Sequence, residues 1–134
     1  MLIINTLRIN SQLQKNMNWF LVFIGGGLGS LLRFGLSILL KNTAGTFPVS
    51  TLVSNVTASF IIGILAGWGL KNSLSEEYKW LLATGFCGGF STFSTFSNET
   101  VQLFQNGNGL NAFINIFISI ALCLSATILG LKMC

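Results

Sequence analysis

Four long apolar stretches divide the chain, and short polar connectors separate them. They occupy residues 18–40, 48–70, 79–104 and 110–132. Each is close to the ~20 residues that a helix needs to cross ~30 Å of hydrocarbon. The pattern therefore predicts an all-α membrane protein with four transmembrane helices.

The connectors carry residues that favour helix starts and turns. Pro48, the single proline, stands where the second helix would begin, a position at which its missing N–H does no harm. Ser75 precedes two acids and is a candidate N-cap for the third helix. The third connector reads QNGNG. Such short links predict four helices that alternate in direction.

Composition excludes several functions. Of 134 residues, 51% are hydrophobic and only 7% are charged, with a mean hydropathy of +0.74, whereas soluble domains average about 25% charged residues. There is no His and no Asp, so acid–base or triad catalysis has little to work with and we predict no enzyme. The basic residues stand singly despite a net charge of +4, so we expect no nucleic-acid partner.

The ends of the chain and the cysteines add little chemistry. The three cysteines are odd in number and widely spaced, at Cys87, Cys123 and Cys134, so neither a disulfide framework nor a zinc site is predicted.

Residues 1–16 form a polar N-terminal extension without helical periodicity, ahead of a transmembrane domain at 17–134. Met17 is an alternative start, which leaves open whether the extension belongs to the mature protein.

Basic residues are unequally divided between the two sides of the predicted helices. One side has Arg8, Lys15, Lys71, Lys79 and Lys132, and the other has Lys41 and Arg33. A start at Met17 would shrink this difference. Because the Lys and Arg bias sets orientation, so weak a bias permits insertion in both directions.

Glycine gathers inside two of the predicted helices, at Gly25, Gly26, Gly27 and Gly29, and at Gly85, Gly88 and Gly89. We interpret the first cluster as close helix packing through small residues. The second is followed at once by Ser-Thr-Phe-Ser-Thr-Phe-Ser, where a helix can break. A break frees backbone groups that protein, water or an ion must satisfy.

The stretch 85–99, GFCGGFSTFSTFSNE, has two chemical faces on a helical wheel. Phe90, Phe93 and Phe96 share one face, and Ser91, Ser94, Thr95 and Asn98 share the other. The simplest interpretation is that the rings pack the bundle while the hydroxyls bond to their own helix. By itself this stretch favours that interpretation.

Three further polar residues lie within the predicted helices. Asn55 is midway along the second, Arg33 is late in the first and Glu99 is late in the third. An arginine at the bilayer centre costs ~3 kcal/mol, so such groups usually face a cavity or a partner. Arg33 and Glu99 could instead reach the membrane surface from near a helix end, and Asn55 could simply hydrogen-bond another helix.

Three motifs in this order resemble the CrcB or Fluc family of small fluoride channels: GGGLGSLLRF (25–34), FPVSTLVSNVTASFIIG (47–63) and GFCGGFSTFSTFSNE (85–99). The resemblance covers nearly all of 18–132, with the third motif the most specific. The fourth helix matches mainly in length and in a polar row at Asn115 and Ser119. Residues 1–16 have no counterpart.

The resemblance implies an antiparallel, dual-topology homodimer in the cell membrane that exports fluoride passively and lowers its cytoplasmic concentration. It implies a structural sodium ion at the dimer centre, held by the backbone carbonyls of Gly88 and Ser91 from both subunits. The implied fluoride pathway includes Asn55, Phe93, Phe96, Ser94, Thr95 and Arg33. Ser91 replaces the family's usual threonine, and Ser50 and Ala58 replace usual glycines.

Two other functions remain open from the sequence. A proton-coupled small multidrug transporter also has four helices, but it needs an acid deep in its first helix, and 18–40 contains none. A membrane subunit without transport activity would use the glycine and phenylalanine motifs for packing alone.

Overall fold

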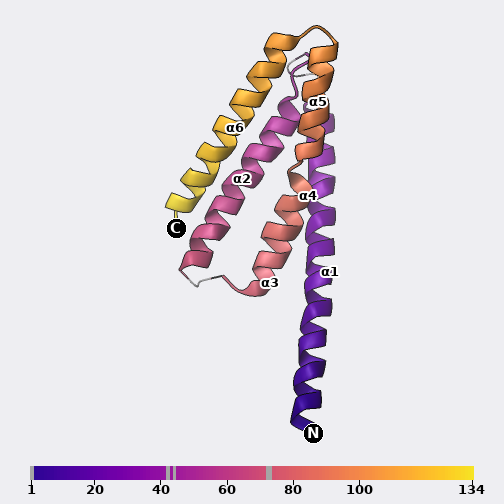
Figure 1. The fold of residues 1–134 in the computed structure, drawn as a ribbon, viewed down its shortest axis with the longest axis vertical. Coiled ribbons are helices and arrows are strands. Elements are labelled where there is room, and N and C mark those ends of the chain that lie inside the picture. The colour runs from indigo at the N-terminus through magenta and orange to yellow at the C-terminus, as the bar shows by residue number, and fades with distance from the viewer. Residues whose placement is uncertain (1, 42, 44, 72–73) are drawn as a thin grey trace.

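The computed structural model describes residues 2–41, 43, 45–71 and 74–134, with side chains from residue 12 onward, and these residues contain helices and turns without strands. The elements are α1 (Leu2–Leu39), α2 (Val49–Leu70), α3 (Glu76–Tyr78), η1 (Lys79–Cys87), α4 (Gly88–Phe90), α5 (Phe93–Gln105) and α6 (Gly109–Lys132). α3, η1, α4 and α5 follow one another as the third of four rods (Figure 1). The predicted four-helix fold is confirmed.

The four rods alternate in direction, so that consecutive ends meet at the short turns (Figure 1). Three helical segments are long and apolar enough to cross a membrane: Gln12–Leu39, Val49–Leu70 and Gly109–Lys132. The third rod is apolar but interrupted between α4 and α5, where the sequence predicted a break. η1 is a π-helix, a wide helix with i→i+5 bonds that is often found at functional sites.

The N-terminal extension is helical, although its sequence shows no helical periodicity. α1 begins at Leu2 and runs without interruption into the first membrane span, because no glycine or proline precedes Gly25. Gln14 Nε2 donates to Glu77 Oε1 at 3.0 Å and so joins the extension to α3. A backbone hydrogen bond, and then bonds from Ser75 and Gln14, hold the pKa of the Glu77 carboxyl below its usual range.

Glycines form the closest helix contacts, as the first cluster predicted. α1 packs mainly on η1 and α4, and α2 packs mainly on α6. A Cβ added to Gly85 would lie 3.0 Å from the Cα of Gly25, and one added to Gly63 would collide with the Thr127 carbonyl and lie 3.1 Å from the Cα of Gly130. Small residues thus let these backbones meet.

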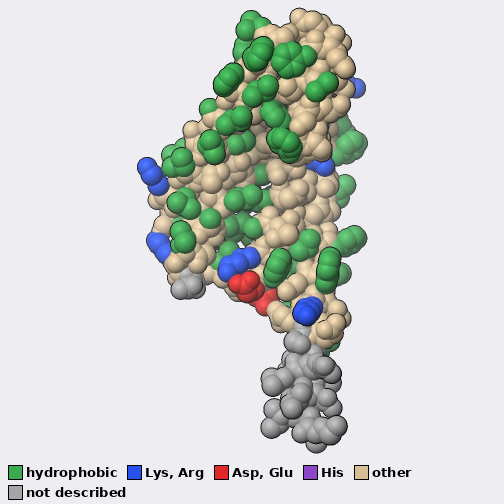
Figure 2. All heavy atoms as spheres, in the orientation of Figure 1, with side chains coloured by type: hydrophobic (Ala, Val, Ile, Leu, Met, Phe, Trp, Pro, Cys, Tyr) green, Lys and Arg blue, Asp and Glu red, His purple; other side chains and the backbone are tan. Residues whose placement is uncertain are grey.

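Small and polar side chains fill the interior, while most large apolar ones face outward. The buried face of α6 carries Ala112, Asn115, Ser119, Ala126 and Gly130. Exposed leucine, isoleucine and phenylalanine side chains cover the outside, and Figure 2 shows hydrophobic groups over much of the visible surface. This distribution suits a molecule whose surroundings are lipid.

Candidate functional site

The break in the third rod is two extended residues long. α4 ends at Phe90 and α5 begins at Phe93. Ser91 has φ −79° and ψ 159°, and Thr92 has φ −156° and ψ 116°. Both values are ordinary extended backbone, so the break stores no strain. It does leave helix-end backbone groups that need other partners.

The side-chain amide of Asn55 hydrogen-bonds to both the N–H and the carbonyl of Thr92. Thr92 N donates to Asn55 Oδ1 at 2.7 Å, and Asn55 Nδ2 donates to Thr92 O at 3.3 Å. The Thr92 hydroxyl accepts from Thr95 N at 3.2 Å and so caps α5. Asn55 therefore makes the interhelical hydrogen bond that the sequence left as an alternative, with one amide N–H left over. Thr92 was not among the predicted residues, although a threonine three before Thr95 fits the N-cap pattern.

The carbonyls of Gly88 and Ser91, predicted as sodium ligands, lose their helical donors at the break. In an unbroken helix they would accept from Thr92 N and Thr95 N, but these two groups donate to Asn55 and to the Thr92 hydroxyl. A Cβ at Gly88 would meet nothing within 4 Å, so this side of the rod is open. Neutral carbonyl oxygens without helical donors are the kind of ligand that a hard cation such as sodium prefers.

The described residues contain no cluster of His, Cys, Asp or Glu that could hold a metal. A cation at this site would therefore depend on backbone oxygens.

Two of the three predicted phenylalanines lie together. The rings of Phe93 and Phe96 are 5.8 Å apart, and Phe93 is 80% exposed. Phe90 is buried and stacks on Phe86 at 5.6 Å. The predicted common face for all three rings is wrong, because the extended residues reorient α5 relative to α4.

The predicted common face for the hydroxyl side chains is also wrong, because the break separates Ser91 from Ser94 and Thr95. Ser91 Oγ donates back to Cys87 O at 2.7 Å, within its own helix. The Ser94 and Thr95 hydroxyls lie beyond the break, 3.2 Å and 3.0 Å from the Thr92 hydroxyl.

Two pockets hold five of the six predicted pathway residues. The first, of ~280 Å³, is lined by Asn55, Ser59, Ser91, Thr92, Phe93, Phe96, Ser119, Ile120 and Cys123. The second, of ~240 Å³, is lined by Ser30, Arg33, Phe34, Ser37, Ser50, Thr51, Thr95 and Glu99. The structure thus brings Asn55, Phe93 and Phe96 together, and places Thr95 and Arg33 in a separate pocket. Ser94 lines neither.

Arg33 caps the short helix α4. Its Nε donates to Gly89 O at 3.1 Å, and Ser30 Oγ donates to the same oxygen at 3.4 Å. A cation at a helix C-terminus is favoured by the helix dipole. From the sequence, Arg33 was expected either to line the fluoride pathway or to extend to the membrane surface. The contact with Gly89 is a different role, which the sequence did not suggest.

Glu99 is held at the start of α2. Its Oε1 accepts from Thr51 Oγ1 at 3.0 Å. Its Oε2 is buried and accepts no hydrogen bond from the described residues. The carboxyl shares the second pocket with Arg33.

A buried polar chain connects α6 to α5. Asn115, 1% exposed, donates through Nδ2 to Thr100 Oγ1 at 2.9 Å, and the Thr100 hydroxyl donates to Phe96 O at 2.7 Å. Ser119 Oγ donates to Asn115 Oδ1 at 3.4 Å and lines the first pocket. The polar row noted in the sequence therefore supports the helix that carries Phe96.

Comparison with known proteins places this arrangement in a family. Residues 20–131 match the model of a family described as CrcB-like protein, Camphor Resistance (CrcB). A protein from Azobacteroides pseudotrichonymphae, named fluoride-specific ion channel FluC, is 48% identical over 113 residues, which are 83% of this chain and 90% of the relative. Relatives of the same name from Flavobacterium psychrophilum and Shewanella oneidensis are 44% and 40% identical over 114 residues, 84% of this chain and 92% of each relative. The chain belongs to the CrcB-like family of membrane proteins.

Proposed function

We propose that this chain forms a fluoride-selective channel through which fluoride leaves the cell passively. The observation that carries the proposal is the Asn55-braced break, which sets the Phe93–Phe96 pair beside hydroxyl groups in one pocket. Relatives with 40% to 48% identity are named fluoride-specific ion channels. None of those names describes an enzyme, in agreement with the scarcity of catalytic side chains.

The chemistry of the first pocket suits a small, strongly hydrated anion. A dry pathway must replace the water around fluoride with other donors, as selectivity filters replace hydration shells elsewhere. Asn55 keeps one amide N–H, Ser59 carries a hydroxyl, and the ring edges of phenylalanine are electropositive. No charged residue lines this pocket, so the anion is not held too tightly to leave.

The pathway would be completed by a second copy in the opposite orientation. Phe93 is largely exposed in the single chain, and the side of the rod at Gly88 is open. In an antiparallel homodimer, Gly88 and Ser91 of each copy would offer carbonyls to a shared sodium ion. A bound cation supplies positive potential for a nearby anion.

Location and direction follow from the same proposal. A channel in the plasma membrane lets fluoride run down its gradient without nucleotide or proton coupling. Net export would then lower cytoplasmic fluoride.

An efflux assay on purified protein in liposomes tests the function. Liposomes loaded with fluoride and chloride salts are monitored with electrodes selective for each anion. We expect rapid fluoride release, retained chloride and no requirement for nucleotide. Chloride release as fast as fluoride release, or release of neither anion, would contradict the proposal.

A further inference from the structure

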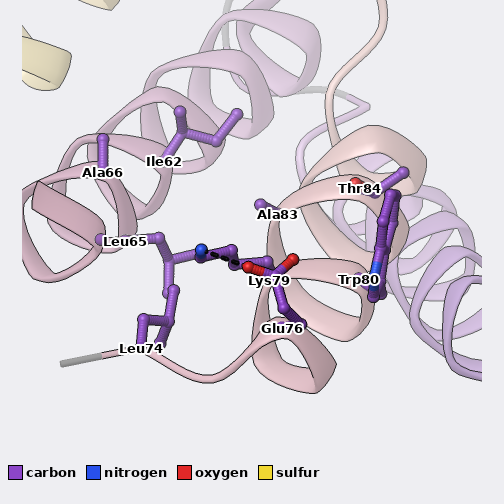
Figure 3. Close-up of a pocket in the computed structure, with 10 residues that line it drawn as sticks. Ile62, Leu65, Ala66, Leu74, Glu76, Lys79, Trp80, Ala83 and Thr84 are labelled. Carbon is purple, nitrogen blue, oxygen red and sulfur yellow. Dashed lines mark hydrogen bonds and ion pairs between the residues drawn. The ribbon is translucent and has the colours of Figure 1, made fainter. Parts of the chain in front are cut away.

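A groove on the outside of α1 and η1 combines a lysine with two indole rings. It has a volume of ~330 Å³ and is lined by Lys15, Asn18, Trp19, Val22, Trp80 and Thr84. The four residues from α1 lie on one face because they are three or four positions apart. Figure 3 shows Trp80 and Thr84 on the side of η1 that faces away from Lys79.

The two walls of the groove are joined. With its amide turned to satisfy both neighbours, Asn18 donates to Gln14 O at 3.2 Å and accepts from Trp80 Nε1 at 3.2 Å. Gln14 also donates to Glu77 at the start of the third rod. α1 and η1 therefore hold the indole of Trp80 in place.

The charge of Lys15 is available for a ligand. No acid lies within ion-pair distance of Lys15 in the part of the chain that the structure describes, and the side chain is exposed. A neighbouring groove, lined on its other side by Leu65 and Ala66, differs in this respect: there Lys79 Nζ lies 2.7 Å from Glu76 Oε1 (Figure 3).

The groove lies at the lysine-bearing end of the bundle. The alternation of the rods brings Lys15, Lys71, Lys79 and Lys132 to this end. Figure 2 shows most of the visible lysine and arginine side chains toward it. Tryptophan prefers the headgroup level of a bilayer, and basic residues there attract anionic lipid.

We propose that this groove binds an anionic phospholipid of the surrounding bilayer. Lys15 pairs with the headgroup phosphate, Trp19 and Trp80 pack against the glycerol region, and Val22 lies along the start of an acyl chain. Lys15, Asn18 and Trp19 precede residue 20, where the family match begins. The groove shares no lining residue with the two pockets of the candidate site, so its occupancy can be tested separately from conduction.

Tryptophan quenching by brominated lipids tests the site. In a Trp68→Phe background, the remaining indoles are Trp19 and Trp80, both in the groove. The full chain is reconstituted with dibrominated phosphatidylglycerol or dibrominated phosphatidylcholine, and the ratio of their binding constants is measured. One lysine at a membrane surface favours anionic lipid by about fivefold. We expect that preference in the background protein, and its loss in Lys15→Gln.

Lys132→Gln is the matched control, because Lys132 lies at the same end outside the groove. It should retain the preference. The proposal is overturned if Lys15→Gln keeps the preference, if both variants lose it, or if the background protein shows none. Weak quenching by both lipids would also overturn it, because lipid would then not reach the two indoles. A second copy of the chain covering the groove would give that result.

Discussion

The two hydrogen bonds between Asn55 and Thr92 let a membrane helix break without leaving both backbone groups of Thr92 unpaired. The amide presents one acceptor and one donor, as a peptide group does, and it pairs with the N–H and the C=O of Thr92. In hydrocarbon each unpaired group would cost several kcal/mol. Asn55 thus determines where Phe93 begins the next helix.

Replacing the pathway phenylalanines separates conduction from packing. Isoleucine keeps bulk and apolarity but removes the electropositive ring edge, an interaction of ~1 kcal/mol. We expect Phe96→Ile and Phe93→Ile to assemble normally and to conduct fluoride about fivefold more slowly. Fluoride efflux and size-exclusion chromatography measure the two properties.

Phe20→Ile is the control for these variants, because Phe20 is 61% exposed on α1 and lines neither pocket of the candidate site. Its flux should equal that of the unchanged protein. Full flux in both pathway variants would rule out the ring-edge mechanism.

At the scale of helices, the glycine contacts make a second prediction. Gly63→Ala would drive a methyl group into the Thr127 carbonyl and force α2 from α6, with an overpacking cost of typically ~1–3 kcal/mol. We expect a lower midpoint of thermal unfolding, followed by circular dichroism in detergent.

Gly27→Ala is its matched control, since an added Cβ there meets nothing within 4 Å. Alanine favours helix over glycine by ~1 kcal/mol, so this variant should be as stable as the unchanged protein or more so. Equal destabilisation of both variants would refute the packing explanation.

The sequence predicted those parts of the fold that depend on local pattern. Apolar length located the spans, and glycines beside hydroxyls located the break at Ser91 and Thr92. The helical wheel misplaced Phe90 because a wheel assumes one continuous helix. The helix in the extension was not predicted, because its apolar residues follow no helical periodicity.

The parts of the candidate site that the sequence missed depend on contacts between distant residues. Arg33 reaches Gly89, 56 positions away, and Asn115 reaches Thr100 from another helix. The periodicity of residues along one helix gives no information about contacts with another helix. The residue roles in conduction stay predictions, which the variants above test.

At the scale of the whole molecule, the helices of a single chain do not cover the candidate site. α2 packs with α6 and α1 packs with η1 and α4, and Phe93 remains exposed. An antiparallel pair would cover this region, and it predicts two orientations in the membrane. In cells expressing a chain without native cysteines, a cysteine at Asn106, exposed at the end of α5, should be labelled to about half by a membrane-impermeant reagent.

Ser91→Cys in the same background tests the centre of the pair, where the two copies of this residue should form a disulfide. Complete labelling or complete protection of the Asn106→Cys chain would indicate a single orientation. That result would exclude the antiparallel pair even if the disulfide formed.

The unbroken length of α1 has a consequence for how the molecule meets its surroundings. Its 38 residues span ~57 Å at the rise of an α-helix, well beyond ~30 Å of hydrocarbon. Helical residues 2–17 precede the apolar stretch that starts at residue 18 and add ~24 Å. A probe attached to the N-terminus would sit on a helical stalk clear of the headgroups. In an antiparallel pair, two such stalks would rise from opposite membrane faces, so one fusion site would give a reporter in each compartment.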